Sequence, residues 1–331
     1  MNENGAANVT GSTSAFAELV NGMRLHYVCS TPGPSPATRV FSGSGVSSGA
    51  GLSSGTGAST GDAPLMLFVH GFPEFWYAWS AQLAFFSATH RAVAFDMRGY
   101  NLSSKPPDVE AYRAGRLVED LRLLIDHLGG APCVLVAHDW GGAVAWAFAA
   151  AHPEYVRKLV IINAPHPTLF ARELSHNPAQ QTASAYMNLF RSTKAERVLS
   201  DNNFKRLQRM TLDTWAANGG AVSDADRAAY YAAWAQAGAL TGGLNYYRAS
   251  RLHPPEPGDP AAAIELKPCN VDVPTLVIWG VRDEALLLGN LDGLDDHVVN
   301  LTVERIPDAS HWVVHERPDV VNALIASFDR A

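Results

Sequence analysis

The amino-acid sequence predicts an α/β protein with a mostly parallel sheet and an inserted helical segment. From Leu65 onwards, runs of apolar residues alternate with stretches of helical periodicity. The apolar runs are continuous, which is typical of strands covered on both faces. The alternation stops between about Ala164 and Pro274, where the chain is rich in tyrosine, tryptophan, alanine and glutamine. Strand–helix alternation indicates parallel strands joined by right-handed crossovers, so we expect one sheet built from two parts of the chain.

Eight short runs are the predicted strands of this sheet. Asn21-Gly22 separates the first two, and Asn-Gly is a strong hairpin signal, so we expect an antiparallel hairpin at the leading edge of the sheet. The helix expected after the AVAF run places five apolar residues on a single stripe, namely Leu117, Leu121, Leu124, Ile125 and Leu128. In chain order, the strand-like runs are FAELV, MRLHYV, LMLFV, AVAF, CVLVA, LVIIN, TLVIW and LTVERI.

Composition divides the chain into a tail, a core in two parts, and two insertions. Proline clusters in APHP and HPPEPGDP bracket the helical segment, and the Gly/Ser-rich stretch after residue 30 has too few apolar residues to bury a core. We therefore expect a disordered tail over 1–15, core segments over 16–164 and 256–331, a flexible insertion over 31–62, and a helical cap over 165–255.

Charge and cysteine usage exclude several classes of partner. The 331 residues carry a formal net charge of -7 and no block of lysine or arginine, which argues against nucleic-acid binding. The 3 cysteines lie far apart and form neither a disulfide framework nor a metal-binding pattern. No apolar run approaches membrane-spanning length, and the N-terminal residues do not resemble a signal peptide. We expect a cytoplasmic protein with no membrane partner. The oligomeric state stays open, with a homodimer as one alternative.

The stretch VAHDWGG at residues 136–142 carries the strongest chemical signal. It joins a predicted strand to a predicted helix, and Asp139 lies at the turn between small residues. A nucleophile on such a turn requires small neighbours, and the positive end of the following helix favours an anion there. Taken alone, Asp139 could equally be the N-cap of that helix, because aspartate is a favoured N-cap residue.

Three further signals follow other predicted strands. The loop HGFP follows the LMLFV run, and in an α/β-hydrolase core this loop lies beside the nucleophile, so Phe72 and Trp140 are the expected backbone N–H donors of an oxyanion hole. Asp283 follows the TLVIW run, and His311 follows the last predicted strand. The chain order nucleophile, acid, histidine is that of α/β-hydrolases. Together, the four signals favour Asp139 as the nucleophile.

An aspartate nucleophile narrows the chemistry. A carboxylate can attack an electrophilic carbon and form an alkyl-enzyme ester, which water activated by His311 then hydrolyses while Asp283 orients the imidazole. A serine would instead form an acyl-enzyme, so an ordinary esterase or lipase is disfavoured. Epoxides and haloalkanes remain as substrates. Opening an epoxide produces an alkoxide that needs a proton donor, whereas a departing halide needs N–H donors.

The sequence resembles the α/β-hydrolase-fold epoxide hydrolases over roughly residues 16–331, apart from the Gly/Ser-rich insertion. The motifs that carry the resemblance are HGFPEFWYAW, RGYNLSS and HDWGG. It implies an α/β-hydrolase fold with an eight-stranded sheet flanked by helices and a helical cap. It also implies that Asp139 is the nucleophile, Asp283 the acid and His311 the base.

The same resemblance assigns two tyrosines of the helical segment. Tyr186 in SAYMNLF and Tyr247 in LNYYR match the family's two cap tyrosines, which protonate or polarise the epoxide oxygen. A tyrosine has an ordinary pKa near 10 and can donate a proton at neutral pH. The resemblance implies that an epoxide and water are the reactants and that no metal or organic cofactor is needed.

Alternative interpretations of these residues stay open at this point. The helical segment contains many aromatic residues whose role is packing, so the residues alone do not select Tyr186 and Tyr247. The Trp140 indole could bind a halide, as in the haloalkane dehalogenases, although Phe72 stands where those enzymes often carry an asparagine donor. The charged residue after the nucleophile and the His-Trp pair of fluoroacetate dehalogenases are not found. A third alternative is a fold reused for ligand binding without catalysis.

Overall fold

A computed structural model describes residues 11–30, 63–129, 132–256, 264, 266 and 268–331 of the chain. The predicted Gly/Ser-rich insertion over 31–62 lies outside the described residues.

An eight-stranded sheet forms the centre of the molecule, with the order β1-β2-β4-β3-β5-β6-β7-β8. β2 pairs antiparallel with β1 and β4, and the remaining pairs are parallel, so the predicted antiparallel hairpin lies at one edge. Every residue of β3, β5 and β7 is buried, as expected for continuous apolar runs. The strands are β1 (Ser12–Glu18), β2 (Arg24–Ser30), β3 (Leu65–Val69), β4 (Arg91–Phe95), β5 (Cys133–His138), β6 (Val156–Ile162), β7 (Thr275–Gly280) and β8 (Leu301–Ile306).

The first strand corrects one expectation. The prediction of a disordered tail over 1–15 is wrong from Ser12 onwards, because β1 begins there. Ser12 pairs with Ser30, and the pairing continues without a break to Glu18 and Arg24. The hairpin therefore extends beyond its apolar residues, because main-chain pairing with β2 orders a segment whose composition alone does not predict a strand.

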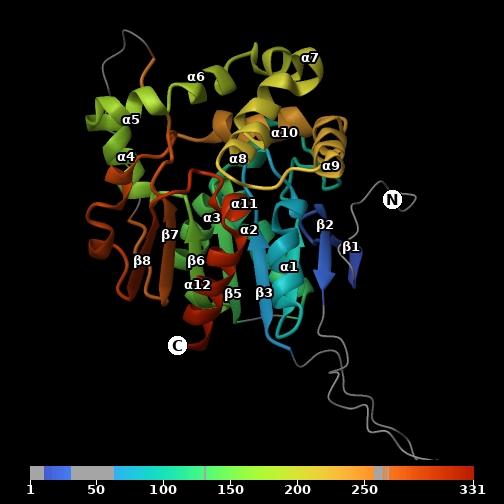
Figure 1. Cartoon of the computed structure of the whole chain (residues 1–331), viewed down its shortest axis with the longest axis vertical. Helices are drawn as coiled ribbons and strands as arrows, with labels where there is room; N and C mark the ends of the chain where they lie inside the picture. Colours follow the sequence, from blue (N-terminus) through green and yellow to red (C-terminus); the bar gives the residue numbers. More distant parts are fainter. Residues whose placement is uncertain (1–10, 31–62, 130–131, 257–263, 265, 267) are drawn as a thin grey trace, which may run out of the picture.

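Helices cover both faces of the sheet (Figure 1). α1 (Ser80–Phe86) and α12 (Pro318–Arg330) lie on one face, and α2 (Ala114–His127) and α3 (Trp140–Ala151) lie on the other. The predicted stripe of α2 is buried, including Leu117 and Leu121. Both faces of the central strands are therefore shielded from water by amphipathic or apolar helices, which explains the absence of polar alternation along those strands.

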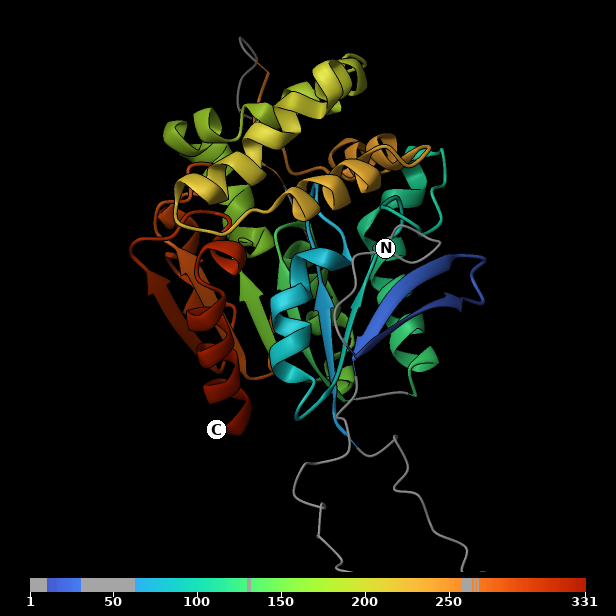
Figure 2. The ribbon, with the colours of Figure 1, turned by 45° about the vertical axis from the view of Figure 1, so that its right-hand side comes forward.

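In the part of the chain that the structure describes, seven helices between β6 and β7 form a layer over the edge of the sheet where Asp139 lies, shown at the top of Figures 1 and 2. We call α4–α10 the helical layer. The layer occupies the part of the chain predicted to be helical. Its helices are α4 (Pro167–His176), α5 (Pro178–Ala183), α6 (Tyr186–Arg191), α7 (Ala195–Met210), α8 (Leu212–Ala217), α9 (Asp224–Trp234) and α10 (Ala239–Ala249).

One helix of this layer approaches the core main chain closely. A Cβ atom at Gly242 of α10 would lie 2.4 Å from the carbonyl oxygen of Gly99, in the loop after β4. Real Cβ atoms do not approach a carbonyl oxygen so closely, so Gly242 lets α10 pack directly on the core. α10 also carries Tyr247. The position of that tyrosine therefore depends on a contact that only glycine permits.

Replacing Gly242 is expected to destabilise the protein. G242A forces α10 and the Gly99 loop apart, and overpacking of this kind costs about 1–3 kcal/mol of unfolding free energy. G115A is the matched control, because a Cβ atom at Gly115 of α2 would have nothing within 4 Å. Urea unfolding should show a loss in G242A and none in G115A. Equal stability of the two variants would contradict the proposed close packing.

Candidate active site

Asp139 lies on a strained turn between β5 and α3. Its backbone has φ 50 and ψ -122, a conformation that is uncommon for a residue with a side chain. A Cβ atom at Gly141 would lie 2.3 Å from the carbonyl oxygen of Val69, and one at Gly71 would lie 2.2 Å from Asp139 Oδ1. The turn therefore requires the small neighbours that the sequence contains. Asp139 occupies the N-cap position of α3, but its side chain makes no capping hydrogen bond there, so capping alone does not explain why this residue is an aspartate.

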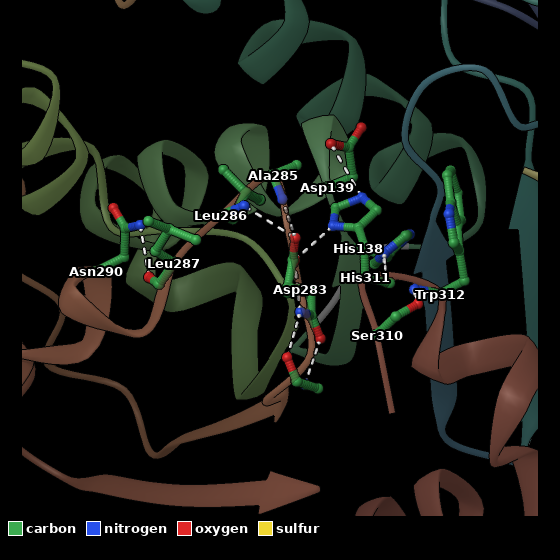
Figure 3. A network of polar contacts seen from close by, with 12 residues as sticks. His138, Asp139, Asp283, Ala285, Leu286, Leu287, Asn290, Ser310, His311 and Trp312 are labelled. Carbon is green, nitrogen blue, oxygen red and sulfur yellow. Dashed lines mark hydrogen bonds and ion pairs between the residues drawn. The ribbon is translucent and has the colours of Figure 1, made fainter. Parts of the chain in front are cut away.

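Asp139, Asp283 and His311 meet at this edge of the sheet (Figure 3). His311 Nδ1 lies 2.8 Å from Asp283 Oδ2, and His311 Nε2 lies 3.6 Å from Asp139 Oδ2. Three loops, after β5, β7 and β8, bring these residues together although they are far apart in the chain. The imidazole thus lies between two carboxylates, in the geometry of a nucleophile, a base and the acid that orients it.

The Asp283 carboxylate is held by four hydrogen bonds. The backbone N–H groups of Ala285 and Leu286 donate to Oδ1, each at 2.9 Å. Asn163 Nδ2 donates to Oδ2 at 2.7 Å, beside the bond from His311. Sequence reasoning missed Asn163, which follows the last residue of β6. The one local signal was a polar residue at the end of an apolar strand, and its partner lies 120 positions further along the chain.

The main chain around His311 is also fixed on both sides. The buried Glu316 accepts from Ser310 N at 2.7 Å and from Ser310 Oγ at 2.5 Å. His138 Nε2 donates to the carbonyl oxygen of His311 at 2.9 Å. His138 therefore has a scaffold role beside Asp139. The role of Glu316 was not foreseen from the sequence.

The pKa values of the facing groups favour an ion pair in the free enzyme. Burial lowers the pKa of His311, but the negative charges of Asp283 and Asp139 outweigh this effect and raise the pKa to about 10. Burial acts to raise the pKa of Asp139, yet the nearby His311 reverses the shift and holds it below its ordinary value. Asp139 is therefore an ionised carboxylate, and His311 is an imidazolium, at neutral pH.

Of the two predicted oxyanion donors, Phe72 contacts the carboxylate. Its backbone N–H donates to Asp139 Oδ1 at 2.7 Å, which leaves Oδ2 facing His311. In the parts of the chain that are described, the backbone N–H of Trp140 makes no hydrogen bond to the Asp139 carboxylate. The role of Trp140 as a second donor stays a prediction.

Tyr186 and Tyr247 face Asp139 from the helical layer. Tyr186 begins α6, Tyr247 lies on α10, and their ring centroids are 6.2 Å apart. Burial and the charge of Asp139 raise the pKa of Tyr186 well above its ordinary value, and burial likewise raises that of Tyr247. Both hydroxyls are therefore protonated. Neighbouring aromatics act elsewhere: the Tyr246 hydroxyl donates to the carbonyl of Arg98.

Two cavities of unequal size meet at these residues. Asp139, Tyr186 and Tyr247 line both. The smaller has a volume of about 60 Å³ and is walled by apolar side chains such as Phe170 and Leu286. The larger, of about 460 Å³, also contains His311 and Asp283. A small organic molecule in the larger cavity can therefore contact Asp139, His311 and both tyrosines.

Comparison with known proteins decides the family. Residues 64–318 match the model of the alpha/beta hydrolase fold. The chain is 36% identical over 272 residues to mouse epoxide hydrolase 4, covering 80% of this chain and 72% of that protein. It is 38% identical to epoxide hydrolase 3 of Xenopus tropicalis, covering 80% and 71%. The chain belongs to the α/β-hydrolase-fold epoxide hydrolases.

Solved structures of this epoxide hydrolase family agree with that assignment. An inhibitor complex of the Bacillus megaterium epoxide hydrolase superposes with a TM-score of 0.80 at 35% identity, covering 96% of this chain and 100% of that one. A second similar structure is that of an epoxide hydrolase from Vigna radiata, with a TM-score of 0.70 at 25% identity. The eight-stranded sheet flanked by helices, predicted from the sequence, is confirmed.

The described residues lack two features that would point to other kinds of site. They contain no group of three or more histidine, cysteine, aspartate or glutamate side chains placed to hold a metal ion. Among the helices that the structure describes, none has the length and apolar character needed to cross a membrane.

The unfolding free energy is expected to depend on His311. An unfolded histidine has a pKa near 6.5, whereas His311 has a pKa of about 10 in the folded protein. The imidazolium therefore contributes stability in full below pH ~6.5, and this contribution is lost as the pH rises through about 10. H311Q lacks the contribution. Urea unfolding across this range should show the advantage of the wild type over H311Q declining with pH, and parallel profiles would contradict the raised pKa.

Proposed function

We propose that the protein hydrolyses epoxides to vicinal diols through a covalent ester on Asp139. The observation that carries the proposal is a single one. An ionised aspartate in the nucleophile turn shares its cavities with two protonated tyrosines and lies 3.6 Å from the imidazole of His311. Membership of the epoxide hydrolase family and the epoxide hydrolase activity named for its relatives support the same reaction class.

In the first step, Asp139 Oδ2 attacks one carbon of the epoxide. A new carbon–oxygen bond forms, the ring carbon–oxygen bond breaks, and its electron pair moves to the ring oxygen. A hydroxyl of Tyr186 or Tyr247 donates a proton to that oxygen as negative charge develops. Because burial and the Asp139 charge raise the pKa of Tyr186, this tyrosine stays protonated until the stronger base, the alkoxide, forms.

In the second step, water attacks the carbonyl carbon of the Asp139 ester. His311 first gives its own proton to the tyrosinate formed in the first step. The neutral imidazole then takes a proton from the water, while Asp283 holds the ring in orientation through the 2.8 Å contact with Nδ1. The Phe72 N–H, which donates to Asp139 Oδ1 in the free enzyme, stabilises the oxyanion of the tetrahedral intermediate. As the ester bond breaks, His311 returns this proton to the departing alkoxide oxygen, which releases the diol. One water oxygen stays in the Asp139 carboxyl group, whose remaining proton passes to His311 and restores the ion pair.

A halide-releasing reaction with the same three residues is the competing function. It would require two N–H donors facing the leaving group. The Phe72 N–H is already engaged by Asp139, and Tyr247 packs edge-on against the Trp140 indole, with ring centroids 5.0 Å apart. Two tyrosine hydroxyls that face Asp139 can donate a proton to an alkoxide. A departing halide does not take up a proton and requires N–H donors instead. The geometry therefore favours the epoxide.

A single turnover in heavy-oxygen water tests the ester mechanism. With enzyme in excess, the label should enter the carboxylate of Asp139 and be absent from the first diol, because the diol's new oxygen comes from the protein. Mass spectrometry of the diol and of the peptide that contains Asp139 measures both. Label in the first-turnover diol would rule the mechanism out. Chloroalkanes assayed in parallel for halide release test the competing function.

Removing His311 should trap the ester. H311Q can form the alkyl-enzyme but lacks the base that activates water, so its mass should increase by that of one substrate molecule. D139N is the control and should gain no mass. An H311Q protein that is folded by circular dichroism yet stays unmodified would exclude Asp139 as the nucleophile. A D139N variant as active as the wild type would leave only a non-covalent or binding role.

A further inference from the structure

Helix α9 contacts the segment that follows the oxyanion donor Phe72. Trp234 Nε1 donates to the carbonyl oxygen of Pro73 at 2.6 Å. Tyr230 donates its hydroxyl proton to Glu74 Oε1 at 2.8 Å. At the far end, Tyr77 donates to Asp226 Oδ1 at 2.7 Å. Along α9 the contacts run from residue 226 to 234, whereas along the loop they run from residue 77 to 73. Helix α9 is therefore antiparallel to residues 73–77.

The three residues of α9 that make these contacts lie on the same face of the helix. Asp226, Tyr230 and Trp234 are four residues apart, so they lie on one face of the helix. Tyr230 and Trp234 are 1% and 6% exposed, and the Tyr230 ring also packs edge-on against Phe75 at a centroid distance of 5.2 Å. One whole helix face of the helical layer is therefore committed to this loop of the core.

The loop transmits these contacts to Phe72. Glu74 N donates to the carbonyl oxygen of Gly71 at 2.9 Å, so Phe72 and Pro73 are the central residues of one closed turn. Pro73 has no N–H, so its carbonyl is the main-chain polar group by which a neighbour can hold it. The Trp234 indole holds that carbonyl, while the Phe72 N–H of the same turn points to Asp139 Oδ1.

We propose that Trp234 is a positioning residue for the oxyanion hole, and that α9 thereby couples the helical layer to the hydrolytic step. The inference rests on the proposed ester mechanism. Displacing Pro73 moves the Phe72 N–H away from the oxyanion, which slows attack of water on the ester. The same displacement does not slow ester formation, because a carboxylate that accepts one hydrogen bond fewer is not a weaker nucleophile.

The variant W234F tests the proposal, because it removes the N–H and keeps a large aromatic ring. Removing an oxyanion donor outright costs about 10²–10³ in rate, so a displaced donor is expected to slow ester hydrolysis about tenfold. Rapid quenching of single turnovers, followed by mass spectrometry, gives the rates of ester formation and decay separately. In W234F, the ester should decay about tenfold more slowly, form at the wild-type rate, and accumulate in the steady state.

Y231F is the matched control. Tyr231 lies on the same helix, but its hydroxyl donates to Gln208 of α7 and not to the loop over residues 73–77, and Y231F keeps the ring that packs against Trp234. Its ester should form and decay as in the wild type. If ester formation and ester decay in W234F keep their wild-type rates, or if both are slowed by the same factor, the proposal is overturned. If the wild type itself forms no ester, the proposed mechanism fails instead, so the two failures are distinguishable.

A second variant keeps the test valid should W234F not fold. Y77F removes the hydroxyl that binds Asp226 at the far end of the same contact. It should slow ester decay in the same direction and by a smaller factor, because Tyr77 lies five residues from Phe72. If folded Y77F forms and hydrolyses the ester at the wild-type rates, the proposed coupling between α9 and the hydrolytic step is overturned. Thermal melting of each variant confirms that folded protein is compared.

Discussion

The imidazole of His311 lies between two carboxylates, and much of the surrounding structure holds these three charges in place. Asp283 is fully buried and the other two are largely removed from water, and such charges are tolerated only when they are paired and hydrogen-bonded. Asp283 meets that condition through four donors, and Asp139 through the Phe72 N–H and His311. Each group comes from a different strand end, so a parallel sheet that brings those ends to one edge is the precondition for the site.

The sequence predicted the parts of the site that depend on local main-chain geometry. Asp139 could be identified because its turn needs small residues on both sides, and Asp283 and His311 because each follows a strand-like run. Asn163 and Glu74 could not be found in this way, since their partners lie 120 and 156 positions away. The start of β1 was missed for a similar reason: pairing with β2, not side-chain pattern, orders Ser12 onwards.

The composition of the helical layer does not predict which of its aromatic residues face Asp139. The sequence does not distinguish Tyr186 and Tyr247 from Tyr230, because all three lie in a tyrosine-rich segment. Only the family resemblance selected Tyr186 and Tyr247. Packing gives the physical difference. Tyr186 and Tyr247 face Asp139, whereas Tyr230 donates to Glu74 in the core. The four-residue spacing of Asp226, Tyr230 and Trp234 was visible in the sequence, but the loop it contacts was not.

In the proposed mechanism, electrostatics also orders the two steps. Before attack, two negative charges raise the pKa of His311 to about 10, so the imidazolium is a poor base. Ester formation cancels the charge of Asp139 and leaves Asp283 alone to stabilise the cation. The pKa of His311 must then fall, so His311 can give its proton to the tyrosinate left by ring opening and, as a neutral imidazole, accept one from water. Formation of the ester therefore converts His311 into the base that hydrolyses it, so the second step cannot precede the first.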